Sequence, residues 1–231
     1  MRQDLFRFFG NHIPKIAILI LRARDGTHTG LIYRDEDGNL RLLQFCLSGE
    51  INDQPWDGKT AHVILDLGED EDALSNLSGL CQTVAQRHDG PPQYRYPYGF
   101  KMGPDSAVLP DGALYLGEDG AATCASFILL ILFQARIELV VRGPDWPHRP
   151  NADDAKHAAL VELYQRHYPN QERRSRMLSQ LPCPRVAPEE IAGAVMCPDP
   201  PASQQFAERA AKWIMGLFDY NRDFNDYTPP T

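Results

Sequence analysis

Hydrophobic residues in the first third of the chain fall in short runs that predict β-strands. Residues 16–21 (IAILIL) form an uninterrupted apolar run of strand length. Residues 28–34 and 40–47 flank the turn-forming sequence DEDGN, and this arrangement predicts a β-hairpin. A further run at 61–67 (AHVILDL) predicts another strand. The N-terminal region is therefore expected to form a small antiparallel sheet.

Beyond residue 70 the spacing of the apolar residues becomes that of helices. Between 70 and 88 they recur every three or four positions, and the sequence DGPP that follows ends the helix. Residues 94–120 are rich in Gly, Pro and Tyr and predict a long loop with one short strand at 113–116. The rest of the chain predicts further helices at about 123–135, 152–167, 171–181, 188–196 and 203–218.

The helix expected at 123–135 is unusual because its central part, Phe127–Phe133, is apolar without a break. A helix that is apolar on all sides belongs in the interior of a protein. It opens with Cys124 behind three small residues, 120–122. A cysteine in the first turn lies near unpaired N–H groups, which favour the thiolate and are placed to stabilise an oxyanion. Cys124 is therefore the candidate nucleophile.

A thiol nucleophile needs a base, and His28 is the candidate for that role. His28 begins the strand expected at 28–34, shortly after the pair Asp25-Gly26. Gly30, two residues later, lies on the same face of the strand and adds no bulk over the imidazole. His62, also at the start of an expected strand, is the alternative base.

The third polar group of the site depends on the geometry of the hairpin turn. If residues 36–38 form a three-residue loop with Gly38 left-handed, Gly30 lies opposite Gln44. His28 and Gln44 are then diagonal neighbours on one face, and the Gln44 carbonyl is able to orient the imidazole. A two-residue Asp-Gly turn would instead shift the register by one and place Gln44 on the other face.

Four segments of the chain resemble circularly permuted papain-like thiol hydrolases, the permuted branch of the NlpC/P60 superfamily. In that branch the histidine strand precedes the cysteine helix, as it does here. The resemblance covers residues 14–140 and is carried by HTGLIYRDEDG (28–38), LRLLQF (40–45), YPYGF (96–100) and TCASF (123–127).

The resemblance implies a cysteine hydrolase of the peptidase or amidase type, which cleaves an amide or acyl bond through a thioester and needs no metal or other cofactor. Cys124 would be the nucleophile, His28 the base and Gln44 the third catalytic group, while Tyr98 and Thr123 would bind substrate. Such families often carry Glu, Asp, His or Asn at the third position. The neutral Gln44 therefore keeps two alternatives open: a weakly active or inactive binding or immunity module with this fold, and a thiol acyltransferase.

Composition narrows the classes of partner. The 231 residues carry a formal net charge of -8 and no long basic run, which argues against nucleic acid and anionic membranes as partners. The five cysteines lack ligand-like spacing, so neither a disulfide framework nor a zinc site is expected. The apolar stretches near the N-terminus are interrupted by charges or too short to span a bilayer. We therefore expect a cytoplasmic protein without a membrane span.

The expected architecture is α+β. Residues 1–146 would form the papain-like core, in which a small antiparallel sheet packs on the buried cysteine-bearing helix. Residues 147–220 would form a helical annex packed on that core, and 221–231 a flexible tail. The expected substrate is a peptide, an isopeptide or an acyl compound, and the annex offers a surface to a protein partner.

Overall fold

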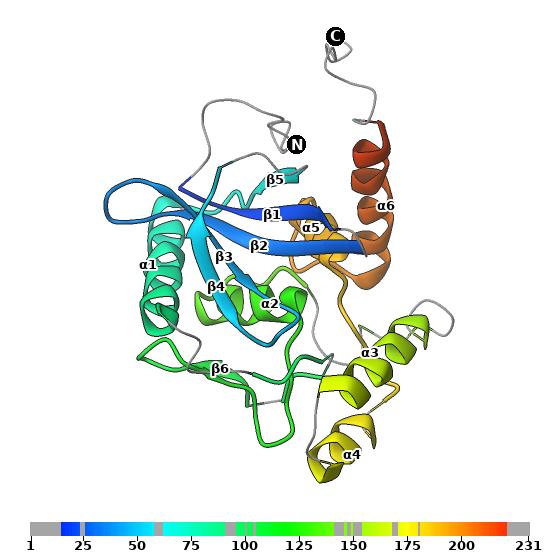
Figure 1. Ribbon diagram of the computed structural model, residues 1–231. Coiled ribbons are helices and arrows are strands. Elements are labelled where there is room, and N and C mark those ends of the chain that lie inside the picture. Colours follow the sequence, from blue (N-terminus) through cyan, green and yellow to red (C-terminus); the bar gives the residue numbers. More distant parts are fainter. Residues whose placement is uncertain are drawn as a thin grey trace.

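The structure is a computed structural model that describes residues 15–23, 26–57, 62–90, 96–99, 101–103, 105–140, 146, 149, 154–167, 171–179 and 181–220. These residues form a mixed α+β fold around a five-stranded antiparallel sheet (Figure 1). The strands of the sheet lie in the order β4-β3-β2-β1-β5. Their bounds are β1 (Ile16–Ala23), β2 (Gly26–Arg34), β3 (Leu40–Phe45), β4 (Ile51–Pro55) and β5 (His62–Asp66).

The helices and a second, two-stranded sheet follow the large sheet in the chain. The small sheet pairs β6 (Ala107–Val108) with β7 (Leu114–Tyr115). The helices are α1 (Glu71–His88), α2 (Cys124–Gln134), α3 (Asp154–His167), α4 (Gln171–Ser179), α5 (Pro188–Val195) and α6 (Gln204–Tyr220). None of the helices in the described part of the chain is both long enough and apolar enough to cross a membrane.

One face of the large sheet is covered by α1, α2 and α5, which lie on the same side of the strands (Figure 1). Because side chains alternate along a strand, Leu31 and Leu43 point to this face and join the main apolar core. Phe45 points to the same face, and the centroid of its ring lies 5.7 Å from that of Phe127 in α2. The uninterrupted apolar run of α2 is explained by this burial.

The opposite face carries a smaller apolar cluster built on Leu19, Ile32 and Leu42, all of them buried. The strand register places Gly30 beside Leu42 on this face. A Cβ atom at Gly30 would lie 2.6 Å from Leu42 Cδ1 and 2.9 Å from the carbonyl oxygen of Leu43. Glycine is therefore required here by the close approach of β3 to β2.

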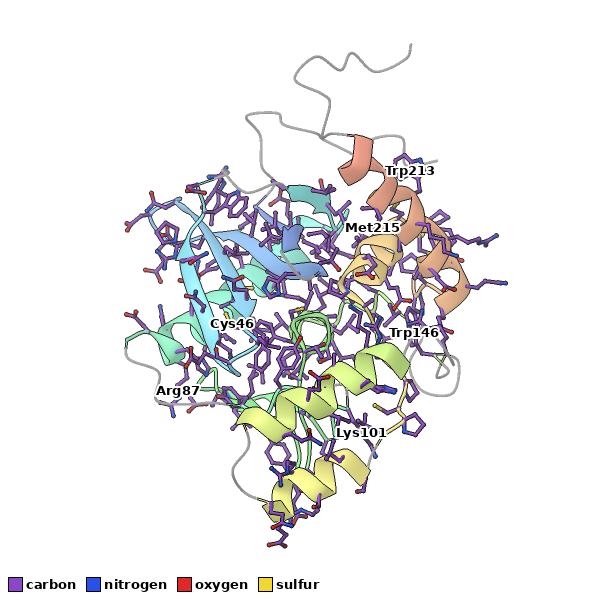
Figure 2. The ribbon with its side chains drawn as sticks, turned by 45° about the vertical axis from the view of Figure 1, so that its right-hand side comes forward. Cys46, Arg87, Lys101, Trp146, Trp213 and Met215 are labelled. Atoms are coloured by element: carbon purple, nitrogen blue, oxygen red, sulfur yellow. The ribbon has the colours of Figure 1, made fainter. Side chains whose placement is uncertain are left out.

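The C-terminal helices belong to the same core as the sheet. Ile191 of α5 and Ile214 of α6 are fully buried in the main cluster. By contrast, Leu160 of α3 packs with Ala121 in a separate small cluster just ahead of α2. Trp213 lies on the outer side of α6 and is 51% exposed (Figure 2). The helical annex thus contacts the elements that carry the candidate nucleophile from two directions.

Gly193 in α5 permits the close packing of α5 on α6. A Cβ atom there would lie 2.1 Å from the carbonyl oxygen of Ala207 and 2.9 Å from the backbone nitrogen of Ala211. We expect Gly193→Ala to lower the free energy of unfolding by about 1–3 kcal/mol, because the two helices must separate. Gly216→Ala is the matched control: it has open space around it, and alanine should stabilise α6 by about 0.5–1 kcal/mol. Urea unfolding of both variants measures the difference; equal stabilities would contradict this packing.

The main elements expected from the sequence are confirmed, namely the antiparallel strands, the helix after residue 70, the buried helix at Cys124 and the C-terminal helices. The strand β4 was missed. Its sequence INDQP is polar and contains Pro55, and such a strand is tolerated at a sheet edge, where β4 lies. The tail at 221–231 and parts of the expected loop at 94–120 fall outside the described residues.

Candidate active site

The hairpin between β2 and β3 has the three-residue loop that brings His28 and Gln44 together. Gly38 is left-handed with φ 81°, and the backbone N–H of Asp35 donates to the carbonyl oxygen of Asn39 across the loop. Gly30 pairs with Gln44, so the predicted register is confirmed. His28 Nε2 lies 2.9 Å from Gln44 Oε1. The alternative of a two-residue Asp-Gly turn, which would place Gln44 on the other face of the sheet, is wrong.

The contact with Gln44 sets the tautomer of His28 when the Gln44 oxygen faces the ring. A carbonyl oxygen only accepts, so His28 Nε2 carries the proton and donates it to Gln44 Oε1. The other ring nitrogen, Nδ1, is then unprotonated and able to accept a proton. Burial lowers the pKa of His28 from its usual value of 6.5, and the hydrogen bond to Gln44 acts in the opposite, weaker direction. At neutral pH the ring is therefore an uncharged base.

Cys124 is the first residue of α2 and is held there by a capping box. The Ser126 N–H donates to Thr123 Oγ1 at 3.2 Å, and the Thr123 N–H donates to Ser126 Oγ at 2.8 Å. Thr123 was expected to bind substrate. In the structure its hydroxyl accepts the cap hydrogen bond and the residue is only 6% exposed, while substrate binding by Thr123 stays a prediction.

The thiol of Cys124 does not have the lowered pKa expected at a helix N-terminus. It is only 4% exposed, and burial raises its pKa to about 11. The backbone N–H groups of Thr29, Ala125 and Cys124 favour the thiolate and oppose this effect in part, whereas Glu189 adds to it. The N–H groups act in the expected direction, but desolvation of the charged sulfur is the larger effect.

His28 and Cys124 approach the end of β2 from different directions. His28 lies on the Leu42 face of the sheet, while the body of α2 packs on the opposite face. Cys124 nevertheless reaches the strand beside the backbone N–H of Thr29, the residue that follows His28. No hydrogen bond joins the His28 ring to the Cys124 sulfur among the described residues. The structure therefore shows no direct contact between the two groups, and the reaction proposed below requires the His28 ring to approach the sulfur when a substrate binds.

Tyr98 is the remaining residue expected at the site. It forms a parallel β-bridge with Ala122, and its ring stacks on Phe45 with centroids 6.1 Å apart. Burial raises the pKa of Tyr98, and the charge of Cys124 contributes to the same shift. The phenol of Tyr98 therefore lies near the Cys124 sulfur, beside the residues that lead into α2.

Two charged residues around the site were not expected from the sequence: Glu189 in the first turn of α5, and Arg185 three residues ahead of that helix. Thr27 Oγ1 donates a hydrogen bond of 2.5 Å to Glu189 Oε2 across 162 positions of the chain. Arg185 lies close enough to Tyr98 to affect its pKa electrostatically. A helix was expected at 188–196, but no local sequence pattern connects that helix to Cys124.

The other candidates from the sequence have ordinary surroundings or lie outside the described side chains. His62 starts β5, but its side chain is not among those described. Cys81 and Cys183 are buried, Cys46 and Cys197 are half-buried, and all are free thiols. No group of three or more His, Cys, Asp and Glu side chains able to hold a metal ion occurs within the described part of the chain.

An open groove of about 740 Å³ lies away from these residues, between α1 and the β3–β4 hairpin. Cys46, labelled in Figure 2, contributes to its lining. Its charged lining is mainly acidic, and Arg41 in it is paired with Asp53 at 2.5 Å. The groove includes neither Cys124 nor His28.

Comparison of the chain with protein-family models, with curated proteins and with solved structures finds no significant match.

Proposed function

We propose that the protein is a cysteine hydrolase of the papain-like, permuted NlpC/P60 type that cleaves an amide or related acyl bond through a thioester on Cys124. The observation that carries this proposal is the hydrogen bond between His28 Nε2 and Gln44 Oε1. It leaves Nδ1 as a free base at the end of the strand where Cys124 meets Thr29. The order of the histidine strand and the cysteine helix agrees with this class.

In the first half of the proposed reaction, the Cys124 thiol gives its proton to His28 Nδ1 as the sulfur attacks the substrate carbonyl carbon. The backbone N–H of Cys124 stabilises the oxyanion that forms. The bond from the carbonyl carbon to the leaving nitrogen or oxygen then breaks, and His28 returns its proton to that leaving group. The acyl group remains on Cys124 as a thioester.

In the second half, His28 removes a proton from a water molecule, which attacks the thioester carbonyl. The carbon–sulfur bond breaks, the carboxylic acid leaves, and Cys124 recovers its proton from His28. The high pKa of the Cys124 thiol, about 11, favours proton transfer during attack over a stable thiolate–imidazolium pair. Because Gln44 is neutral, it orients the ring without stabilising a charged imidazolium.

Gln44→Ala is expected to reduce the rate of Cys124 acylation by about two- to tenfold, the value of one orienting hydrogen bond. Gln44→Glu should retain activity or raise it, because a carboxylate orients the ring and also favours its protonated form. Rates of acylation by an activated ester, measured by peptide mass spectrometry, compare the variants with the wild-type protein. A Gln44→Ala variant as fast as wild type would contradict the orienting role.

The second candidate is a binding module that keeps the fold without turnover. It is favoured by the raised pKa of Cys124, since a thiol that stays protonated attacks poorly without an effective base. Incubation with a peptide-based thiol-reactive probe, followed by mass spectrometry, separates the two. The hydrolase is expected to label at Cys124 in a manner that depends on His28. A binding module would show no such dependence.

A further inference from the structure

The groove between α1 and the β3–β4 hairpin takes no part in the proposed reaction, and its lining is strongly acidic. Its volume of about 740 Å³ lies within the range of clefts that bind ligands, about 300–1,000 Å³. Six of the residues that line it carry a carboxylate: Asp35, Glu36, Asp37, Glu50, Asp53 and Asp89.

The positive charge in this lining is already neutralised. Among the described residues that line the groove, Arg41 is the single Lys or Arg, and its Nε donates to Asp53 Oδ2 at 2.8 Å. The Tyr33 hydroxyl donates to the other oxygen of the same carboxylate at 3.0 Å. His88 also lines the groove, and burial lowers its pKa, so its ring adds no positive charge at neutral pH. The groove therefore favours a cationic occupant.

One wall of the groove is formed by β4, the strand at the edge of the sheet (Figure 1). The Trp56 N–H donates to the carbonyl oxygen of Leu40, and hydrogen-bonded pairs alternate from there along the antiparallel ladder of β3 and β4. This alternation points the backbone N–H groups of Ile51 and Asp53 away from β3. Neither N–H has a hydrogen-bond partner in the described part of the chain. Both residues line the groove.

The open part of this edge is short. At its start the Tyr96 N–H donates to the carbonyl oxygen of Gly49 at 2.7 Å, and at its end Pro55 has no N–H to offer. The stretch between them suits a short extended segment. A second copy of this chain, with its formal net charge of -8, would bring like charge to the acidic lining. The edge therefore disfavours self-association and favours a basic partner.

We propose that the groove binds an extended basic segment of a partner protein, which adds as a strand to β4 at Ile51 and Asp53. Backbone hydrogen bonds supply affinity in this mode, and the side chains at alternate positions supply specificity. Lys or Arg at those positions faces the carboxylates, while the aliphatic stems pack on Ile51 and Ala85. The inference goes beyond the proposed hydrolase function and does not depend on it, because the groove includes neither Cys124 nor His28.

Binding is measured with the full chain and a short labelled peptide of alternating Lys and Thr, by fluorescence anisotropy. The matched peptide of alternating Glu and Thr is expected not to bind. Strand addition is read from amide hydrogen exchange by NMR at saturating Lys-Thr peptide. Exchange at Ile51 and Asp53 should slow by about tenfold or more, because their N–H groups gain partners. The N–H of Asn52 faces β3 and should change little, so it is the internal control.

The double variant Glu50→Gln, Asp89→Asn is expected to weaken binding of the Lys-Thr peptide by about threefold or more, the effect of two partly screened charge pairs. Both residues line the groove. The matched control is Glu71→Gln, Asp72→Asn. It removes the same two charges from exposed positions at the start of α1, about 27 Å from the end that carries Asp89, and should leave the affinity unchanged.

Peptide binding without slower exchange at Ile51 and Asp53 would be contact by charge alone and would overturn strand addition. Equal affinities of the two double variants, binding of the Glu-Thr peptide as tight as that of the Lys-Thr peptide, or no binding of either would also overturn the inference. None of these measurements involves Cys124 or His28, so failure of the proposed hydrolase function is distinguishable from failure of this one.

Discussion

His28→Ala is expected to slow acylation of Cys124 at neutral pH by about 10²- to 10⁴-fold, the usual contribution of a positioned general base. The reason lies in two opposite pKa shifts. Burial holds the pKa of His28 below 6.5, so the ring is a neutral base at pH 7. Burial also raises the pKa of Cys124 to about 11, so the thiol is almost entirely protonated without help.

The pH profile distinguishes this mechanism from a preformed thiolate. In the wild-type protein the acylation rate should rise as pH increases through the lowered pKa of His28 and level off by neutral pH. In His28→Ala the rate should instead keep rising through the alkaline range toward the pKa of the thiol, about 11. Stopped-flow or quench measurements with an activated ester give both profiles. Identical profiles would contradict a role of His28 in proton transfer.

Arg149→Met is expected to lower the free energy of unfolding by about 3 kcal/mol at pH 7, because it leaves the buried carboxylate of Glu190 without its cation. Glu190 is 3% exposed, and its contacts fix the first turn of α5, which carries Glu189. Arg176→Met is the control. It removes an exposed arginine paired with Asp119 and should cost far less stability than Arg149→Met.

The loss in Arg149→Met should shrink on acidification. Burial already raises the pKa of Glu190 in the wild-type protein despite Arg149, and removal of the arginine raises it further. A carboxyl whose folded pKa is raised binds more protons when folded, so lowering the pH through that pKa stabilises the folded state. Urea unfolding at pH 7 and pH 5 measures the change. If Arg149→Met and Arg176→Met lose the same free energy of unfolding at both pH values, the ion pair between Arg149 and Glu190 does not have the expected importance.

The parts of the site predicted correctly from the sequence depend on local chemistry. The DEDGN turn set the hairpin loop, and the loop set the register that pairs Gly30 with Gln44. The unbroken apolar run after Cys124 indicated a buried helix, and α2 begins at that residue. Turn type, strand alternation and helix burial are all encoded within a few neighbouring residues.

The parts that were missed depend on contacts between distant segments. The Thr27–Glu189 hydrogen bond joins positions 162 residues apart, and no periodicity indicates it. The pKa of Cys124 was expected to be low from its place at a helix N-terminus. The pKa is raised instead, because the surrounding core buries the sulfur deeply. The depth of burial depends on the whole fold and cannot be read from a local sequence pattern.

The most direct test of the proposed chemistry is the site of acetylation after brief exposure of the folded protein to p-nitrophenyl acetate at pH 7. Peptide mass spectrometry of the wild-type protein is expected to place one acetyl thioester on Cys124, ahead of the more exposed Cys46 and Cys197. The same experiment on His28→Ala should leave Cys124 unmodified. Acetylation of Cys46 or Cys197 before Cys124, or equal acetylation of Cys124 in the wild-type and His28→Ala proteins, would contradict a nucleophile activated by His28.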